Sequence, residues 1–270
     1  MSAPSDRWSD LMPRLLSAVV MIAVGGAALT LGGVWLRLLA MLAAAAMTWE
    51  LVRMTHAPFA DPAGRRPLIG AAVMAAALVP VLFYDTTLAL LIPVVVAAGL
   101  AGRAAGPMVQ ALTPLYTGAI AVTALVLVAQ REVLGLPAVI WLIGVVVASD
   151  VMGYLVGRLL GGPKFWPRVS PKKTWSGTVA GWFGAALVGA GFAAAGQVGW
   201  GIVPVSVLVS FAGQMGDIAE SALKRRAGVK DSSALIPGHG GFLDRFDALI
   251  GAALTVFVLT VAGLMPGFGG

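Results

Sequence analysis

Long apolar runs recur along this chain and constrain its fold more than any other feature. A helix that crosses a bilayer needs about 20 mostly apolar residues, and runs of about 18 or more follow one another from Arg14 onward. Only 11% of the 270 residues are charged, whereas a soluble domain carries about 25%. Too few polar side chains remain to cover a surface that faces water. The sequence therefore predicts an all-α fold, a polytopic transmembrane helix bundle.

We expect about nine spans, separated by breaks rich in glycine, proline and aspartate. Their ranges are 14–33, 35–54, 67–84, 86–102, 107–129, 136–157, 177–196, 200–224 and 246–265. The breaks are expected at Gly32-Gly33, at 61–64, near Asp85, at Gly106-Pro107, at 135–137 and at 196–199. We see no internal repeat and no soluble domain, so residues 1–270 are interpreted as a single integral membrane domain.

Basic residues test this division, because Lys and Arg concentrate on the cytoplasmic side of membrane proteins. With nine spans and a cytoplasmic N-terminus, all of the eighteen Lys and Arg residues except Arg37 and Arg131 lie on or beside the cytoplasmic face. The same rule explains the net charge of +6, so we do not expect nucleic acid as a partner. The absence of cysteine excludes disulfides and thiolate metal sites.

Acidic residues are informative, because an ionised side chain inside a membrane is unfavourable and is usually functional. Six of the twelve lie in the C-terminal half, namely Asp150, Asp217, Glu220, Asp231, Asp244 and Asp247. Asp217 shares a helix face with Ser221 and Lys224, and Asp244 and Asp247 share a face at the start of the last span. These carboxylates either pair with basic side chains or bind a hard divalent cation, which prefers oxygen ligands. For the set as a whole we favour the metal site.

Two polar loops carry further candidate residues. In 236–241, Ile-Pro-Gly-His-Gly-Gly, the glycines allow positive φ angles, and backbone N–H groups of such a turn can bind an anion. His239 is interpreted as a general base, a phosphate ligand or a turn residue. In the other loop, Ser170 is expected to cap a helix that begins at Pro171. Lys172 and Lys173 would then lie at a helix N-terminus suited to phosphate, although an ordinary basic loop against anionic lipid is the alternative.

Residues 221–247 resemble the signature of the phosphatidate cytidylyltransferase family. The run reads Ser221-x-x-Lys224-Arg225, then Lys230-Asp231, then Pro237-Gly238-His239-Gly240-Gly241-x-x-Asp244-Arg245-x-Asp247. Asp150 and the loop from Ser170 to Thr174 also resemble the family, which places the catalytic half at about 136–250. One departure is Ser176, which stands where many members have glutamate.

The resemblance implies transfer of the cytidylyl group from CTP to phosphatidic acid, which gives CDP-diacylglycerol and pyrophosphate. It implies a homodimer in the bacterial inner (cytoplasmic) membrane, in contact with membrane lipid and with its active site facing the cytoplasm. Mg2+ is the implied cofactor, with K+ as a further cation. The implied metal ligands are Asp150, Asp217, Asp244 and Asp247.

The implied catalytic residues are Asp217, Asp244, Asp247, Lys230 and His239. The implied substrate-binding residues are Ser170, Lys172, Lys173, Thr174, Ser221, Lys224, Arg225, Asp231, Gly238, Gly240, Gly241 and Arg245. Two alternatives stay open. One is another CTP-dependent lipid enzyme, and the other is a cation transporter whose intramembrane carboxylates form the ion path.

Overall fold

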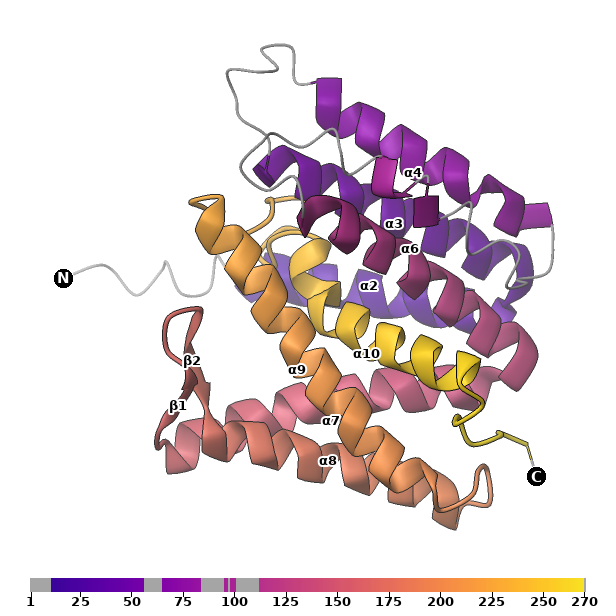
Figure 1. Ribbon diagram of the computed structural model, residues 1–270, viewed down its shortest axis with the longest axis vertical. Coiled ribbons are helices and arrows are strands. Elements are labelled where there is room, and N and C mark those ends of the chain that lie inside the picture. The colour runs from indigo at the N-terminus through magenta and orange to yellow at the C-terminus, as the bar shows by residue number, and fades with distance from the viewer. Residues whose placement is uncertain (1–10, 56–64, 84–94, 97, 101–111, 270) are drawn as a thin grey trace. The chain divides into compact units, whose positions relative to one another are not determined.

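Helices make up most of the chain in this computed structural model, which describes residues 11–55, 65–83, 95–96, 98–100 and 112–269 (Figure 1). They are α2 (Leu11–Leu31), α3 (Gly33–Thr55), α4 (Arg65–Phe83), α6 (Leu112–Ala129), the π-helical turn η3 (Gln130–Leu134), α7 (Leu136–Leu160), α8 (Trp175–Ala194), α9 (Ile202–Arg226) and α10 (Leu243–Val261). Strands β1 (Lys164–Trp166) and β2 (Ser170–Thr174) pair antiparallel. Seven helices of the described part are long and apolar enough to cross a bilayer. The prediction of an all-α polytopic bundle is confirmed.

Seven of the expected spans coincide with these seven helices, and the span expected at 246–265 coincides with α10, which is not one of the seven. The span expected at 86–102 lies largely outside the described residues, as do the breaks at 61–64, near Asp85 and at Gly106-Pro107. The break at Gly32 is confirmed, since its φ of 63° is one that other residues rarely adopt, and α3 begins at the next residue. The last helix begins at Leu243 rather than at 246, so its first turn includes Asp244 and Arg245.

Contacts between residues divide the chain into two compact units, and each is described by itself. Unit 1 comprises Met1–Ala121 and Ala227–Phe246, and unit 2 comprises Val122–Arg226 and Asp247–Gly270. In unit 1, α3 packs against α2 and α4. Its buried face includes Leu36, Ala40, Ala44, Met47 and Leu51, spaced three and four residues apart as helical packing requires. The interpretation as one domain stays a prediction.

Unit 2 is built around very close contact between α7 and α8. A Cβ added to Gly177 of α8 would lie 2.5 Å from the Gly153 carbonyl oxygen and 3.3 Å from the Gly157 Cα of α7. Gly153 and Gly157, like Gly177 and Gly181, are four residues apart, the small-residue spacing that lets membrane helices approach. Helix α9 then packs against α8, and the apolar interior includes the fully buried Trp141 and Ile202.

Gly177→Ala is expected to lower stability by about 1–3 kcal/mol, because the new methyl group would meet backbone atoms that cannot move aside without separating the helices. Gly191→Ala is the matched control. It lies on the same helix, and its Cβ would meet nothing within 4 Å, so we expect unchanged or slightly higher stability. Thermal unfolding of the purified protein in detergent measures both. Equal midpoints for the two variants would contradict the proposed contact.

Candidate functional site

The segment between α7 and α8 is a hairpin, and this corrects one prediction. Ser170 does not cap a helix that begins at Pro171, because residues 170–174 form strand β2, in which Ser170 pairs with Trp166. The residue before a proline prefers extended backbone, and an edge strand tolerates the missing N–H group. The helix begins at Trp175 instead. Its N-cap is Thr174, whose side-chain oxygen accepts a hydrogen bond from the Gly177 N–H at 3.2 Å.

Several contacts fix this hairpin to the helices beside it. The ring of Phe165 in β1 packs edge-on against Trp175, with centroids 4.7 Å apart. The Trp175 N–H donates to the Pro163 carbonyl oxygen at 3.0 Å. Ser176 donates its hydroxyl hydrogen to the Gly161 carbonyl oxygen, and its oxygen lies 3.0 Å from that of Thr174. In this chain the residue that departs from the family pattern therefore joins the end of α7 to the start of α8.

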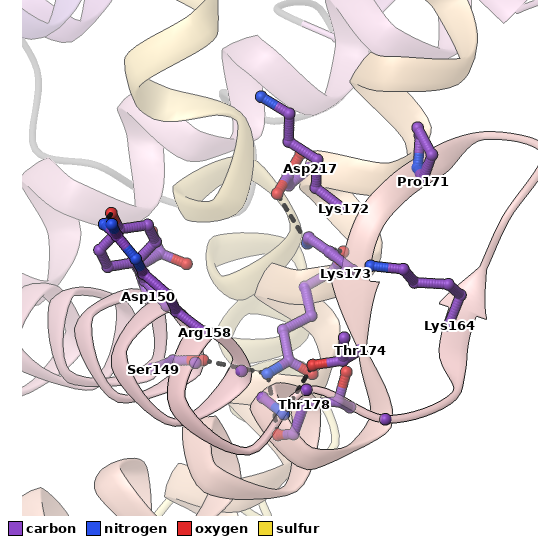
Figure 2. A pocket seen from close by; sticks show the side chains of 17 residues that line it. Ser149, Asp150, Arg158, Lys164, Pro171, Lys172, Lys173, Thr174, Thr178 and Asp217 are labelled. Atoms are coloured by element: carbon purple, nitrogen blue, oxygen red, sulfur yellow. Dashed lines mark hydrogen bonds and ion pairs between the residues drawn. The ribbon is translucent and has the colours of Figure 1, made fainter.

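A pocket of about 700 Å³ opens between α7, the hairpin, α8 and α9, entirely within unit 2. Figure 2 shows Lys164, Lys172 and Lys173 of the hairpin on one side, with Asp150 and Arg158 of α7 on the other. Four basic residues line the pocket against two acidic ones, Asp150 and Asp217. The N-terminus of α8 also lies at the pocket, since Thr174 and Gly177 are lining residues. Excess positive charge and a helix N-terminus both favour an anionic ligand.

The side of the pocket formed by Ser149, Thr178 and Gln214 is a buried polar network. Gln214 donates to the Ser149 hydroxyl oxygen at 3.3 Å and to the Thr178 carbonyl oxygen at 3.2 Å. Its own side-chain oxygen accepts from the Trp182 indole at 3.0 Å. Ser210 donates to the Ser149 hydroxyl oxygen at 2.8 Å. Both the NH2 group and the carbonyl oxygen of the Gln214 side chain therefore have hydrogen-bond partners. Because these partners lie on α7 and α8, the network fixes α7, α8 and α9 around the pocket.

Among the basic residues that line the pocket, Lys173 is bound to both the side chain and the backbone of α9. Its ammonium lies 2.6 Å from Asp217 Oδ2 and donates to the Gln214 carbonyl oxygen at 3.2 Å. Asp217 Oδ1 accepts from the Ser221 hydroxyl at 3.3 Å. One turn further along α9, Lys224 forms an ion pair with the fully buried Glu220. The half-buried ion pair between Lys173 and Asp217 thus joins β2 to α9 at the pocket.

Two carboxylates of unit 2, Asp150 and Asp217, each act electrostatically on a third, Asp247. Among the described residues, no three or more His, Asp and Glu side chains form a ready metal site. Mg2+ is commonly held by one or two carboxylates and keeps several waters, so a larger cluster is not required for its binding. The metal ligands expected from the sequence stay a prediction.

The glycine loop belongs to unit 1 and forms a tight turn. The Ile236 N–H donates to the Gly240 carbonyl oxygen at 2.7 Å, and the His239 N–H donates to the Ile236 carbonyl oxygen at 2.9 Å. Gly238 and Gly240 have φ angles of 74° and 82°, which confirms the expected need for glycine. His239 Nδ1 lies 2.8 Å from the Ser17 hydroxyl of α2. The histidine is therefore bound to a neighbouring helix at the tip of the turn.

Asp244 holds this loop from the first turn of α10. Its Oδ2 accepts from the Gly241 N–H at 2.8 Å, the Ser232 N–H at 3.0 Å and the Ser232 hydroxyl at 2.9 Å. Glu50 of α3 binds the same segment. Its carboxylate accepts from the N–H groups of Phe242 at 2.9 Å and Leu243 at 2.7 Å. The anion that these loop amides bind is thus a carboxylate of the protein, whereas the sequence led us to expect a phosphate there.

The predicted site residues fall into two groups. Unit 2 contains Asp150, Ser170, Lys172, Lys173, Thr174, Asp217, Ser221, Lys224, Arg225 and Asp247, and unit 1 contains Lys230, Asp231, Gly238, His239, Gly240, Gly241, Asp244 and Arg245. The pocket brings together Asp150, Lys172, Lys173, Thr174 and Asp217. The expected approach of Asp217 to Asp244 stays a prediction, because each is described with its own unit.

Sequence reasoning missed three important groups. Lys164 lines the pocket but belongs to no motif, and Gln214 precedes Asp217 by three residues, hence on the same helix face. Glu50 gave the clearest missed signal, since it is an ionisable residue within the long apolar run of α3. Its role became visible only with its partners, which lie more than 180 positions away in the sequence.

Comparison with known proteins decides the family. The sequence profile of the cytidylyltransferase family matches residues 12–262, nearly the whole chain. The chain belongs to the cytidylyltransferase family. The resemblance drawn from residues 221–247 is thereby confirmed at the level of the family.

Curated phosphatidate cytidylyltransferases are similar to this chain over about half of its length. A phosphatidate cytidylyltransferase of Brucella abortus biovar 1 (strain 9-941) is 43% identical over 148 residues, which are 53% of this chain and 54% of the relative. One of Helicobacter pylori (strain J99 / ATCC 700824) is 43% identical over 128 residues, 46% and 47% of the two chains. One of Staphylococcus aureus (strain COL) is 39% identical over 119 residues, 43% and 46% of the two. The chain thus spans about half the length of the curated relatives it matches.

Thr174→Ala is expected to destabilise the protein by about 1 kcal/mol, because the Gly177 N–H of α8 would lose its cap. Thr174→Ser keeps the hydroxyl oxygen and should retain most of that stability. Thermal unfolding in detergent measures the difference between the two variants. If the alanine variant is as stable as the serine variant, Thr174 does not act as the N-cap.

Proposed function

We propose that this protein transfers the cytidylyl group from CTP to phosphatidic acid and releases CDP-diacylglycerol and pyrophosphate. The observation that carries the proposal is the pocket of unit 2. Its basic lining and its helix N-terminus suit a phosphate-bearing ligand. Family membership and relatives named phosphatidate cytidylyltransferase support the same reaction.

The chemistry asks mainly for positioning and charge neutralisation. An oxygen of the lipid phosphate attacks the α-phosphorus of CTP, the bond from that phosphorus to the bridging oxygen breaks, and pyrophosphate leaves with the bonding electrons. The lipid phosphate is already ionised near neutral pH, so a protein base is not obligatory. Lysine ammonium groups at the pocket stabilise phosphate charge, and held geometry makes the attack effectively unimolecular.

Each unit supplies different residues to this proposal. In unit 2, Lys164, Lys172 and Lys173 bind phosphate oxygens, and Asp217 orients Lys173 through their ion pair. In unit 1, Asp244 is presented at the start of α10 by the ordered loop. Mg2+ held by Asp217 and Asp244 would supply charge neutralisation on the triphosphate and on the leaving group. We further propose K+ as an additional cation, a homodimer, and an active site on the cytoplasmic side of a bacterial inner membrane.

The pocket disfavours the alternative of a cation transporter. A cation path through the bundle would present more carboxylates than ammonium groups, whereas four basic residues face two acidic ones here. One of those two, Asp217, is moreover paired with Lys173. In this proposal Asp217 therefore orients a phosphate-binding lysine and is not part of a cation path.

A direct assay tests the function. The purified protein in detergent is incubated with phosphatidic acid, CTP and Mg2+, and pyrophosphate and a cytidine-containing lipid are measured. We expect both products from CTP and neither when ATP replaces it. No lipid product from CTP, or an equal yield from ATP, would refute the proposal. Ion uptake into proteoliposomes without lipid turnover would support the transporter.

Lys172→Ala is expected to raise the KM for one of the two anionic substrates roughly tenfold, because one charge-assisted phosphate contact is lost. The substrate whose KM rises is the one whose phosphate lies at β2. Arg168→Ala is the matched control, since Arg168 is an exposed basic residue of the same hairpin that does not line the pocket. Steady-state kinetics with each substrate varied in turn separates the two. Equal effects of both variants would show that only the general positive charge matters.

A further inference from the structure

We infer that Glu50 is a positioning residue for the proposed reaction, holding the loop from Ser232 to Leu243 in the shape that presents Asp244. This inference rests on the proposed function. Glu50 lies on α3, is fully buried, and belongs to no motif by which the family resemblance was drawn.

Within the described residues, the hydrogen bonds to the Glu50 carboxylate all come from one distant segment. Oε1 accepts from the Ser233 hydroxyl at 2.6 Å and the Phe242 N–H at 2.9 Å. Oε2 accepts from the Leu243 N–H at 2.7 Å and lies 3.3 Å from the Ser232 hydroxyl. Both ends of the loop, 232–233 and 242–243, are therefore attached to one side chain, and α10 begins at the second of them.

Glu50 and Asp244 act on the same few atoms. Ser232 has one hydroxyl hydrogen, and its oxygen lies within hydrogen-bond distance of both carboxylates. Gly241 lies between them, because an added Cβ would be 2.5 Å from Glu50 Oε1, while its N–H donates to Asp244. Any displacement of the loop from Glu50 therefore changes the donors that orient Asp244.

Ionised glutamate fits this position, and the isosteric amide does not. Each carboxylate oxygen of Glu50 receives one backbone N–H, from Phe242 and from Leu243. A serine hydroxyl can rotate to accept a hydrogen bond, but a backbone N–H cannot. In Glu50→Gln the amide NH2 must face one of these two N–H groups, which leaves a buried donor without an acceptor.

The test compares Glu50→Gln with a matched control on the same helix, Thr48→Val. Thr48 is fully buried, and within the described part of the chain its hydroxyl has no hydrogen-bond partner. For each full-length variant in detergent we would measure kcat, both KM values, thermal unfolding, and hydrogen exchange at Phe242 and Leu243. We expect Glu50→Gln to lower kcat tenfold to hundredfold, as loss of an orienting partner does, with nearly unchanged KM values. Exchange at the two amides should rise at least roughly tenfold, while Thr48→Val matches the wild type.

Ser233→Ala gives an independent and milder reading, because it removes one of the four contacts and leaves the carboxylate in place. We expect a twofold to tenfold loss of kcat. If Glu50→Gln does not fold, the kcat and the exchange rates of Ser233→Ala test the inference in its place. The inference would be overturned if Glu50→Gln kept the kcat and the hydrogen exchange of the wild type. If Glu50→Gln is unfolded, the same result in Ser233→Ala would overturn it. If the wild-type protein itself forms no cytidine lipid, the proposed function fails, and exchange at Phe242 and Leu243 still decides whether Glu50 orders the loop.

Discussion

A carboxylate inside an apolar helix bundle must find donors, and this requirement organises both units of the chain. In unit 1 the buried Glu50 receives two backbone N–H groups at the start of α10. In unit 2 Asp217 pairs with Lys173 of the hairpin, and Glu220 pairs with Lys224. A buried charge without such partners would be strongly destabilising. Glu50 and Asp217 therefore each fix a polar segment beside the helices, whereas Glu220 finds its partner within α9 itself.

Close contact between α7 and α8 is the second feature on which the pocket depends. Glycines at 153, 157 and 177 bring the backbones of α7 and α8 together at the end where the hairpin joins them. With bulkier residues the two helices would separate, and Thr174 would move away from α7, whose Gly157 leaves no room for a Cβ beside the threonine oxygen. The glycines therefore set the width of the pocket, and the polar network around Gln214 determines which donors and acceptors face it.

The sequence predicted what depends on local pattern, and it missed what depends on distant partners. Apolar run length was sufficient for the helices, and the break at Gly32 followed from glycine alone. The dipeptide Ser170-Pro171 fits both a helix start and the entry to an edge strand, and only the pairing with 164–166 decides between them. The glycine loop was recognised correctly as a place of positive φ angles. That its amides bind Glu50 and Asp244 could not be predicted, because a motif does not show which anion its donors will meet.

The carboxylates on the loop amides determine which groups remain to bind phosphate. The N–H groups of Gly241, Phe242 and Leu243 are engaged by carboxylates, so in the proposed function the phosphate contacts fall mainly to the lysines of the hairpin. A two-stranded hairpin alone is marginally stable in water. Here the packing of Phe165 on Trp175 and the bond from Ser176 to Gly161 hold it against the helix ends. The electrostatics of the pocket thus depend on an aromatic contact and a serine that do not line it, because they hold the hairpin that carries the ammonium groups.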